Sequence, residues 1–597
     1  MGFWKSAVVF GLLAFWIYYF TRSSKTITTE KVNATYDYIV VGAGSAGSVV
    51  AARLSEESGV NVLVLEAGPD SSDWRTSVPI ASSDMWHSKF DWDYYTVPQK
   101  GCGFIGDNPG VHHWPRGKLL GGTGMLNSLQ YVRGSRHDYD EWANNGNLGW
   151  SYEEVLPYFL KSENMLDSAF SDSKYHSTEG PLGVTVEKNV PMTGRFIEAG
   201  KELGFDEIDY NGESDFGFLE PQVNVVNGRR ASTLHALLRP AMTRSNLHVV
   251  AEAHVTNIEF DGQRASGVTF VRNGIKTSVH ANKEIILSAG AIGSPQILML
   301  SGIGPKAHLE KLYIQVIADL PVGQNLQDHL LVPMRSKVNI SGEGINLSLT
   351  KLPFHVWKYL MFKSGVLSTT TVAGTAFLKS AHSKTEYPDI QFHFCPVLPP
   401  ASELKLSTKY NKDVFYEDWE EGFYLYPILL HPKSRGTITL KSKDPFDHPY
   451  IDPNYLSARE DVDVFIDAMK YGMKLMESDT FKKIGTNPEN IILKACKGLE
   501  FKSDDFYECM IRHYANTIHH QTSTCRMGPD GDSNSVVDNQ LRVKGVTGLR
   551  VVDASVMPNI VSGNTNAPII MIAEKASDMI RGKDTVSQLK NRLKNAV

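Results

Sequence analysis

Residues 36–68 read YDYIVVGAGSAGSVVAARLSEESGVNVLVLEAG, and this stretch decides the fold. Asp37–Val41 is apolar and β-branched, which is typical of a buried parallel strand. Ala46–Glu57 predicts a helix, and Val60–Leu65 predicts a second strand that ends at Glu66. The stretch therefore predicts one strand–turn–helix–strand unit of a doubly wound α/β fold.

The turn in this unit has the pattern G-x-G-x-x-G, formed by Gly42, Gly44 and Gly47. The first glycine permits a tight turn, the second lets the backbone approach a pyrophosphate, and the third lets the helix pack on the strand. Glu66 can accept hydrogen bonds from ribose hydroxyls, and its charge disfavours the 2′-phosphate of NADP. The unit thus gives the first candidate dinucleotide-binding residues: Gly42, Gly44, Ser45, Ala46, Gly47, Glu66 and Ala67.

Length and composition exclude several classes of protein. A chain of 597 residues suggests roughly three to four domain equivalents, or two elaborated domains. The hydrophobic fraction of 42% and the charged fraction of 21% are typical of an ordered globular protein. The net charge of −6 does not indicate a nucleic-acid partner. Five cysteines stand far apart without paired metal spacing, so we expect no metal site.

Residues 1–25 form a separate hydrophobic segment. Ser6–Phe20 is an uncharged run of 15 residues between Lys5 and Arg22. As a helix it would cover about 22 Å, which is short for a bilayer core of about 30 Å unless Gly2–Trp4 join it. No clear cleavage site follows. Membrane association through residues 6–20 and a cleaved secretory signal both stay open, and the side of the membrane is not determined.

Four further segments indicate how the chain is organised. Lys283–Leu287 and Leu549–Asp553 resemble strands of the same parallel sheet as the first unit, so this domain is discontinuous in sequence. Ile390–Phe394 and Gly436–Ser442 alternate apolar and polar residues, which predicts half-exposed antiparallel strands.

Two helices are predicted in the C-terminal part. Apolar residues at helical spacing run from Val462 to Met476, after a Ser457–Glu460 capping-box pattern. This methionine-rich stripe predicts a helix packed on a sheet. Asn566 begins a second apolar helix that runs to about Ile580, with proline in its first turn.

Two glycine-rich loops lie outside the first unit. In residues 111–140, VHHWPRGKLLGGTGMLNSLQYVRGSRHDYD, three glycines surround Thr123. Such a loop can lay backbone N–H groups along a diphosphate or a flavin edge, although a plain turn at a domain joint has the same composition. Residues 290–304, GAIGSPQILMLSGIG, read as a turn, an apolar helix start and a second glycine turn.

With these loops the sequence resembles the glucose–methanol–choline (GMC) oxidoreductases. Gly117–Asp140 fits the first family signature and Gly290–Gly304 fits the second. The resemblance covers residues 36–582 and is closest to animal glucose dehydrogenase-like and choline dehydrogenase-like members. It implies a Rossmann-type α/β domain that binds FAD and an α+β substrate domain with an antiparallel sheet backed by helices. The expected bounds are 36–160, 222–325 and 538–582 for the FAD-binding domain, and 161–221 and 326–537 for the substrate-binding domain.

The resemblance also implies a catalytic pair. Residues 519–528, HHQTSTCRMG, are similar to the family's H-x-x-x-T-C-x-M run, which assigns the catalytic role to His520 rather than His519. The partner position falls on Asn564. A neutral imidazole can take the hydroxyl proton of an alcohol while a hydride passes to flavin N5, and an asparagine can orient the alkoxide without titrating.

Further cofactor contacts carry over from the family. The position that tethers FAD covalently through histidine in some members is Leu126 here, so we expect noncovalent FAD. The remaining predicted cofactor residues are Gly121, Thr123, Met125, Asn127, Val255, Asp553, Ala554, Asn564 and Thr565.

The substrate prediction depends on one departure from the family. Choline-specific members place a glutamate where Ala373 stands in TVAGTAF, residues 371–377. Without this carboxylate a neutral, apolar alcohol is favoured, oxidised to an aldehyde or ketone with His520 as base. The alternatives are a choline dehydrogenase proper and a non-redox FAD-binding lyase of the same fold. The electron acceptor, O₂, a quinone or another carrier, stays open.

Overall fold

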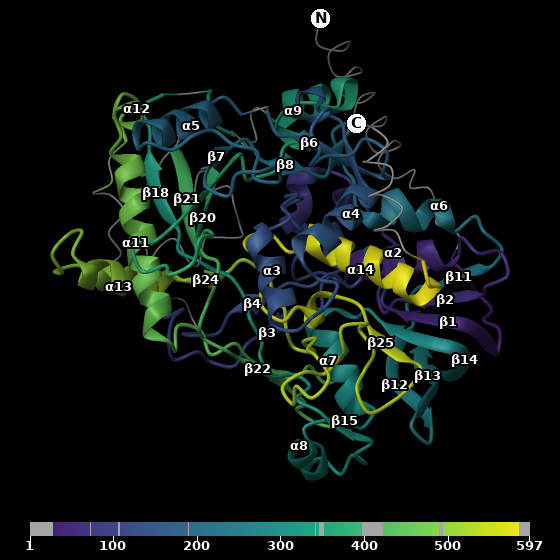
Figure 1. Ribbon diagram of the computed structural model, residues 1–597. Coiled ribbons are helices and arrows are strands. Elements are labelled where there is room, and N and C mark those ends of the chain that lie inside the picture. The colour runs from purple at the N-terminus through teal and green to yellow at the C-terminus, as the bar shows by residue number, and fades with distance from the viewer. Residues whose placement is uncertain are drawn as a thin grey trace, which may run out of the picture.

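The computed structural model describes residues 28–583 apart from 72, 106–107, 189, 341, 346–351, 397–421, 487 and 489–493. Two seven-stranded sheets organise these residues, and helices cover them (Figure 1). The hydrophobic segment at residues 1–25 lies outside the described residues. No helix in the described ranges is both long and apolar enough to cross a bilayer.

The first sheet contains the N-terminal unit and has the strand order β11-β2-β1-β14-β13-β12, with β25 also paired to β14. β1 pairs in parallel with β2 and β14, whereas the β12–β13–β14 connections are antiparallel. The strand bounds are β1 Thr35–Val41, β2 Val62–Leu65, β11 Leu247–Val250, β12 His254–Asp261, β13 Arg264–Arg272, β14 Ile275–Leu287 and β25 Leu549–Val551. Three separate stretches of chain therefore build the sheet, which confirms a discontinuous Rossmann-type domain.

Helix α2 (Ser45–Leu54) starts at the carboxyl end of β1. Gly42 has a φ of 95°, and a Cβ on Gly47 would lie 1.9 Å from the carbonyl oxygen of Gly42, so both positions require glycine. The helix ends three residues earlier than predicted because Ser55 caps it and a turn follows. Helix α14 (Asn566–Arg581), predicted from its apolar stripe, packs along α2, and its Glu574 pairs with Arg53.

The second sheet is antiparallel and has the order β24-β17-β21-β20-β19-β7, with β18 paired to β21. Helix α11 (Arg459–Met476) packs on β21, and its methionine stripe is buried as predicted. The strand bounds are β7 Gly217–Leu219, β17 Leu330–Leu331, β18 Met334–Lys337, β19 Gly374–Leu378, β20 Ile390–Cys395, β21 Gly422–Leu429 and β24 Asn516–Thr517. This layer matches the expected α+β architecture.

Two local predictions were wrong. β20 is not half-exposed: all six of its residues are buried, because the polar side chains of Gln391 and His393 lie in the protein interior. The capping box at Ser457–Glu460 does not form, because Ala458 is the N-cap of α11 and makes no side-chain bond there. The other alternating segment does pair as predicted, as β22 (Thr437–Thr439) with β23 (Tyr450–Asp452).

A disulfide between Cys496 and Cys509 was not predicted. It joins the short helix Lys494–Cys496 to α13 (Asp504–Tyr514) across 13 residues. The three other cysteines are free and buried. The spacing of the pair fits no common motif, so the sequence carried no signal for it.

The remaining elements connect or cover the two sheets (Figure 1). The helices are α3 Arg136–Asn144, α4 Tyr152–Ser162, α5 Met192–Glu202, α6 Arg239–Ala241, α7 Gly290–Leu300, α8 Lys306–Lys311, α9 Leu352–Phe362 and α12 Asp479–Lys482. The short strands are β3 Tyr94–Tyr95, β4 His113–Trp114, β5 Glu163–Met165, β6 Leu182–Val186, β8 Gln222–Val223, β9 Val225–Val226, β10 Arg229–Arg230, β15 Ile303–Gly304 and β16 Ala318–Asp319.

Candidate functional site

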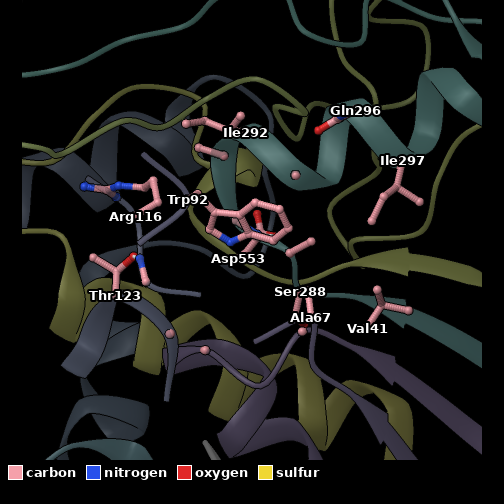
Figure 2. A pocket seen from close by; sticks show the side chains of 18 of the residues that line it. Val41, Ala67, Trp92, Arg116, Thr123, Ser288, Ile292, Gln296, Ile297 and Asp553 are labelled. Carbon is pink, nitrogen blue, oxygen red and sulfur yellow. Dashed lines mark hydrogen bonds between the residues drawn. The ribbon is translucent and has the colours of Figure 1, made fainter. Parts of the chain in front are cut away.

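A cavity with an empty volume of about 1180 Å³ opens at the carboxyl edge of the first sheet. In Figure 2, Arg116 and Thr123 lie on one side of it, α7 passes along another side, and the Trp92 ring stands in front of Asp553. Parallel strands of this topology place a ligand at this edge, beyond their carboxyl ends. The cavity is therefore the site that the N-terminal unit predicts.

Three helices begin at this cavity. The N-terminal residues of α2, α7 and α14 contribute to its lining through Gly44–Ala46, Gly290–Gly293 and Thr565. The first N–H groups of a helix lack intrahelical partners and carry partial positive charge. Their convergence on one cavity suits a ligand with negative charge, such as a diphosphate.

The glycine-rich turn of the first unit and the glycine-rich loop around Thr123 meet beside these helix ends. A Cβ on Gly122 would lie 2.7 Å from the Cα of Gly44, so the loops touch backbone to backbone. A Cβ on Gly44 would meet only the Cα of Gly122, at 3.9 Å, because Gly44 faces the cavity. Ser288 Oγ and Gln521 Oε1 belong to lining residues and have no hydrogen-bond partner among the described residues. This polar, glycine-lined cradle fits FAD.

Glu66 lies at the end of β2, where a ribose acid is expected. Its carboxylate accepts the Ala43 N–H at 2.9 Å and the Gly68 N–H at 2.8 Å, one on each oxygen. Burial raises the pKa of Glu66 to about 7, against the opposing effect of these two amides. Each oxygen keeps a lone pair, so the carboxylate both shapes the turn and can accept a hydroxyl group.

The predicted cofactor residues divide into two groups. Those that line the cavity are Gly42, Gly44, Ser45, Ala46, Glu66, Ala67, Thr123, Val255, Asp553, Ala554 and Thr565. Those that do not line it are Gly47, Gly121, Met125, Asn127 and Asn564. In the second group, Asn127 makes a hydrogen bond within the protein: its Oδ1 accepts from Arg230 Nη1 at 2.7 Å. Met125 is likewise buried and accepts the Ser232 hydroxyl on its sulfur at 3.1 Å.

Several lining residues were missed by sequence reasoning. Residues Gly290–Gly293 belong to the second family signature but were not assigned a contact, although they line the cavity. Trp92, Tyr94 and Arg116 also line it. Aromatic residues and one arginine in an irregular stretch carry no motif, so no pattern could have singled them out.

His520 and Asn564 lie together, and each directly precedes a residue that lines the cavity, Gln521 and Thr565 respectively. Asn564 Nδ2 lies 3.3 Å from His520 Nε2, and both residues are buried. His519 takes a different direction: its backbone has a φ of 68°, and its ring packs edge-on against Trp86. Only the second histidine of the pair therefore contacts the asparagine.

A second histidine fixes the tautomer of His520. His329 Nε2 lies 2.9 Å from the carbonyl oxygen of Leu430, which can only accept, so Nε2 of His329 carries the hydrogen. His329 Nδ1 is then an acceptor, and it lies 3.0 Å from His520 Nδ1, which must donate. His520 Nε2 is left with a lone pair. It accepts from Asn564 Nδ2, and Asn564 Oδ1 accepts from Gln391 Nε2 at 3.4 Å.

These imidazoles are neutral at neutral pH. Burial lowers the pKa of His520 well below its usual 6.5, with smaller contributions from His329 and His393. Burial also lowers the pKa of His329 to about 3 and that of His393 to about 4. A neutral His520 with no proton on Nε2 has the protonation state that a general base requires.

Asp328 holds the loop that carries His520, and it was also missed. Its Oδ1 accepts the backbone N–H of His520 at 2.8 Å, and its Oδ2 accepts the hydroxyls of Thr517 and Tyr455. Burial raises the pKa of this carboxylate to about 6. The interaction fixes the backbone position of His520 without touching its ring.

Comparison with known proteins places this geometry in context. The GMC oxidoreductase family model matches residues 36–331 with its N-terminal part and residues 432–573 with its C-terminal part. Glucose dehydrogenase [FAD, quinone] of Drosophila melanogaster is 37% identical over 94% of this chain and 89% of its own length. Human mitochondrial choline dehydrogenase is 37% identical over 92% of this chain and 90% of its own length. Pyridoxine 4-oxidase from Mesorbium loti superposes with a TM-score of 0.78 at 28% identity, over 92% of this chain and 100% of that structure.

Proposed function

Because the chain belongs to the GMC oxidoreductase family and is an FAD-dependent oxidoreductase of CH–OH groups, we propose that it dehydrogenates a neutral, apolar alcohol with His520 as the base. The observation that carries this proposal is the hydrogen-bond geometry that assigns the proton of His520 to Nδ1 and leaves Nε2 beside Asn564. The class of reaction follows from the family, whereas the substrate and the residue roles are proposals.

The proton transfer follows from the hydrogen bonds around His520. The alcohol hydroxyl donates its proton to Nε2, while Nδ1–H keeps its bond to His329. The Asn564 amide N–H, which contacts Nε2 in this structure, then donates to the alkoxide oxygen. When bound, FAD supplies the acceptor for the hydride from the carbinol carbon. The residues expected to hold it are the cavity-lining glycines, Glu66 and the Asp553–Ala554 turn.

The surroundings of Ala373 support an uncharged substrate. Ala373 is fully buried in an apolar cluster with Val190 and Ile345. Glu187 contacts the same segment, but its Oε2 accepts the Thr370 N–H at 3.2 Å. A trimethylammonium group would therefore meet apolar side chains at this position, which disfavours choline.

Anaerobic flavin reduction tests both the reaction and the substrate. The purified protein is mixed without oxygen with sugars, choline, fatty alcohols, sterols or terpenols, and the loss of flavin absorbance is followed. We expect bleaching by apolar alcohols and weak bleaching by choline. An unreduced flavin together with cleavage of a cyanohydrin would instead establish the lyase alternative. Fast reduction by choline would refute the substrate assignment.

We also propose that the enzyme works in an oxidising compartment, as a secretory or membrane-attached protein. The Cys496–Cys509 disulfide supports this, because such bonds persist in oxidising surroundings. The apolar run at Ser6–Phe20 supports it independently. Peptide mapping without reductant, on protein from its native host, should recover the two cysteines as one linked peptide. Free thiols at both positions would contradict the proposal.

A further inference from the structure

Helix α9 (Leu352–Phe362) concentrates exposed apolar side chains on the surface. Its 11 residues include five large apolar side chains that are exposed by 37% to 62%. They are Leu352, Phe354, Trp357, Met361 and Phe362. Soluble proteins seldom gather such side chains in one place unless the surface has a partner. We call these five residues the α9 strip.

The three aromatic rings of the α9 strip contact one another, and a buried tyrosine elsewhere on the helix packs against the protein. The Phe354 and Trp357 rings stack with centroids 5.9 Å apart, and the Trp357 and Phe362 rings meet at 5.4 Å. Tyr359 lies on the side of the helix away from Phe354, Trp357 and Met361; it is 2% exposed and packs against Val78 and Ala81. Figure 1 shows α9 at the edge of the molecule, at the opposite end from α8.

The stretch of chain that contains α9 carries charge of one sign. Residues 344–385 contain no aspartate or glutamate, but they contain Lys358 and Lys363 on and just after the helix. Lysines beside exposed aromatic and aliphatic residues are typical of helices that lie in a membrane interface, where their stems extend the ammonium groups to the headgroups. An 11-residue helix is about 16 Å long, which is too short to span a bilayer.

We propose that α9 docks on an anionic lipid bilayer, with the α9 strip among the headgroups and Lys358 and Lys363 at the level of the lipid phosphates. A second copy of the chain fits this surface less well. A symmetric contact through α9 would bring the same lysines of both copies together without an acidic partner from this segment. Docking of α9 on a bilayer determines the location of the enzyme, and it does not depend on the proposed substrate.

A site-specific probe tests the docking. The Met361→Cys variant of the full, FAD-loaded chain is labelled with a nitrobenzoxadiazole fluorophore. The label is selective because Cys102, Cys395 and Cys525 are buried and the other two cysteines form the disulfide. Vesicles of phosphatidylcholine with phosphatidylserine should shift the emission to the blue, and quenchers carried on the lipids should quench it. The labelled Tyr313→Cys variant is the control, because Tyr313 is 91% exposed just after α8, and its emission should not change.

Substitutions in the α9 strip and at the two lysines separate the apolar and the electrostatic contributions to docking. In the labelled background, Trp357→Ser should raise the vesicle concentration for half-maximal response by roughly tenfold or more, because it removes one buried aromatic side chain. Lys358→Glu with Lys363→Glu should abolish the preference for anionic vesicles, as should high salt. Trp357 is exposed and both lysines are partly exposed, so both variants should keep the flavin content and unfolding temperature of the parent protein.

Three results would overturn the proposal. The labelled chain could sediment with vesicles while its emission stays aqueous, which would mean that another segment makes the contact. The label could already be shielded before vesicles are added, which would mean that a segment of the same chain or a second copy covers the α9 strip. The emission could also remain unchanged with no binding to either kind of vesicle.

Discussion

His329 Nδ1 lies 3.0 Å from His520 Nδ1, although the two residues are 191 positions apart in the chain. Because His329 Nε2 donates to the Leu430 carbonyl, only His520 can supply the hydrogen of this bond. The contact therefore leaves His520 Nε2 as the free base. In the proposed mechanism His520 therefore moves the proton, whereas His329 only orients the imidazole of His520.

The first prediction concerns the two adjacent histidines. His520→Ala should bind FAD normally but slow flavin reduction by roughly 10²- to 10⁴-fold, the usual contribution of a positioned base. His519→Ala should be much milder, because its ring packs on Trp86 and does not contact Asn564. Stopped-flow reduction measures both variants. Loss of reduction in His519→Ala with normal reduction in His520→Ala would reverse the assignment.

His329 should act as a positioning residue. His329→Leu removes the acceptor for His520 Nδ1–H, so the imidazole is free to take the wrong tautomer. A misplaced tautomer is costly for a general base, and we expect reduction to slow by roughly 100-fold or more with little change in flavin content. His329→Asn offers a side-chain carbonyl to the same N–H and should recover part of the rate. Equal rates for Leu and Asn variants would show that His329 has only a packing role.

The pH dependence of flavin reduction follows from the pKa of His520, which burial lowers well below 6.5. A lowered pKa keeps the base neutral through the physiological range, so the rate should be constant above pH 6.5 and fall only at more acid pH. Acid also lowers the stability of the folded protein, because it favours the protonated forms of the buried His329 and His393. Their folded pKa values lie below the unfolded value, so stability is lost as the pH falls below about 6.5. Unfolding temperatures in the same buffers separate the two effects, and a rate that still rises between pH 7 and 9 would contradict the assignment.

The sequence predicted the first unit of the fold because its signals are local. The apolar run at β1, the three glycines and Glu66 stand within 31 residues, and each has a direct physical meaning. Contacts between distant segments were harder to predict from the sequence. The His329–His520 contact depends on two-residue strands, in which Leu330 of β17 pairs with Thr517 of β24. Strands of this length show no periodicity, so no pattern in the sequence joins them.

The burial of β20 illustrates a second limit. Alternation of apolar and polar residues indicates a strand with two unlike faces, but it does not say whether the polar face meets water. In β20 the polar face is interior, where Gln391 contacts Asn564 at 3.4 Å. A polar residue of the alternating pattern, Gln391, therefore contacts the candidate site. The Cys496–Cys509 bond likewise depends on the position of α13, which the cysteine spacing alone does not specify.

The mode of FAD attachment gives a prediction that needs no substitution. Leu126 cannot form a histidyl–flavin bond, so precipitation with acid should release all of the flavin into the supernatant. The absorbance of the supernatant and of the washed pellet measures the two fractions. Yellow colour retained in the pellet would show a covalent bond at another residue.

The last prediction uses the different surroundings of two glycines in one motif. Gly44 has ordinary extended backbone angles, and a Cβ there meets only the Gly122 Cα at 3.9 Å. Gly44→Val should therefore fold, but its side chain would occupy the space in which a pyrophosphate approaches the backbone. We expect a colourless protein whose unfolding temperature no longer rises when FAD is added, because ligand stabilisation requires binding to the folded state.

Gly47→Ala is the matched control for this test. A Cβ on Gly47 would lie 1.9 Å from the Gly42 carbonyl oxygen, inside the turn and away from the cavity. This variant should lose stability itself, with a lower unfolding temperature in the absence of FAD, whereas Gly44→Val should match the cofactor-free parent protein. Circular dichroism melts of all three proteins without cofactor make the comparison, and flavin content is measured after reconstitution. A Gly44→Val protein that retains full flavin would show that the diphosphate does not lie at the start of α2.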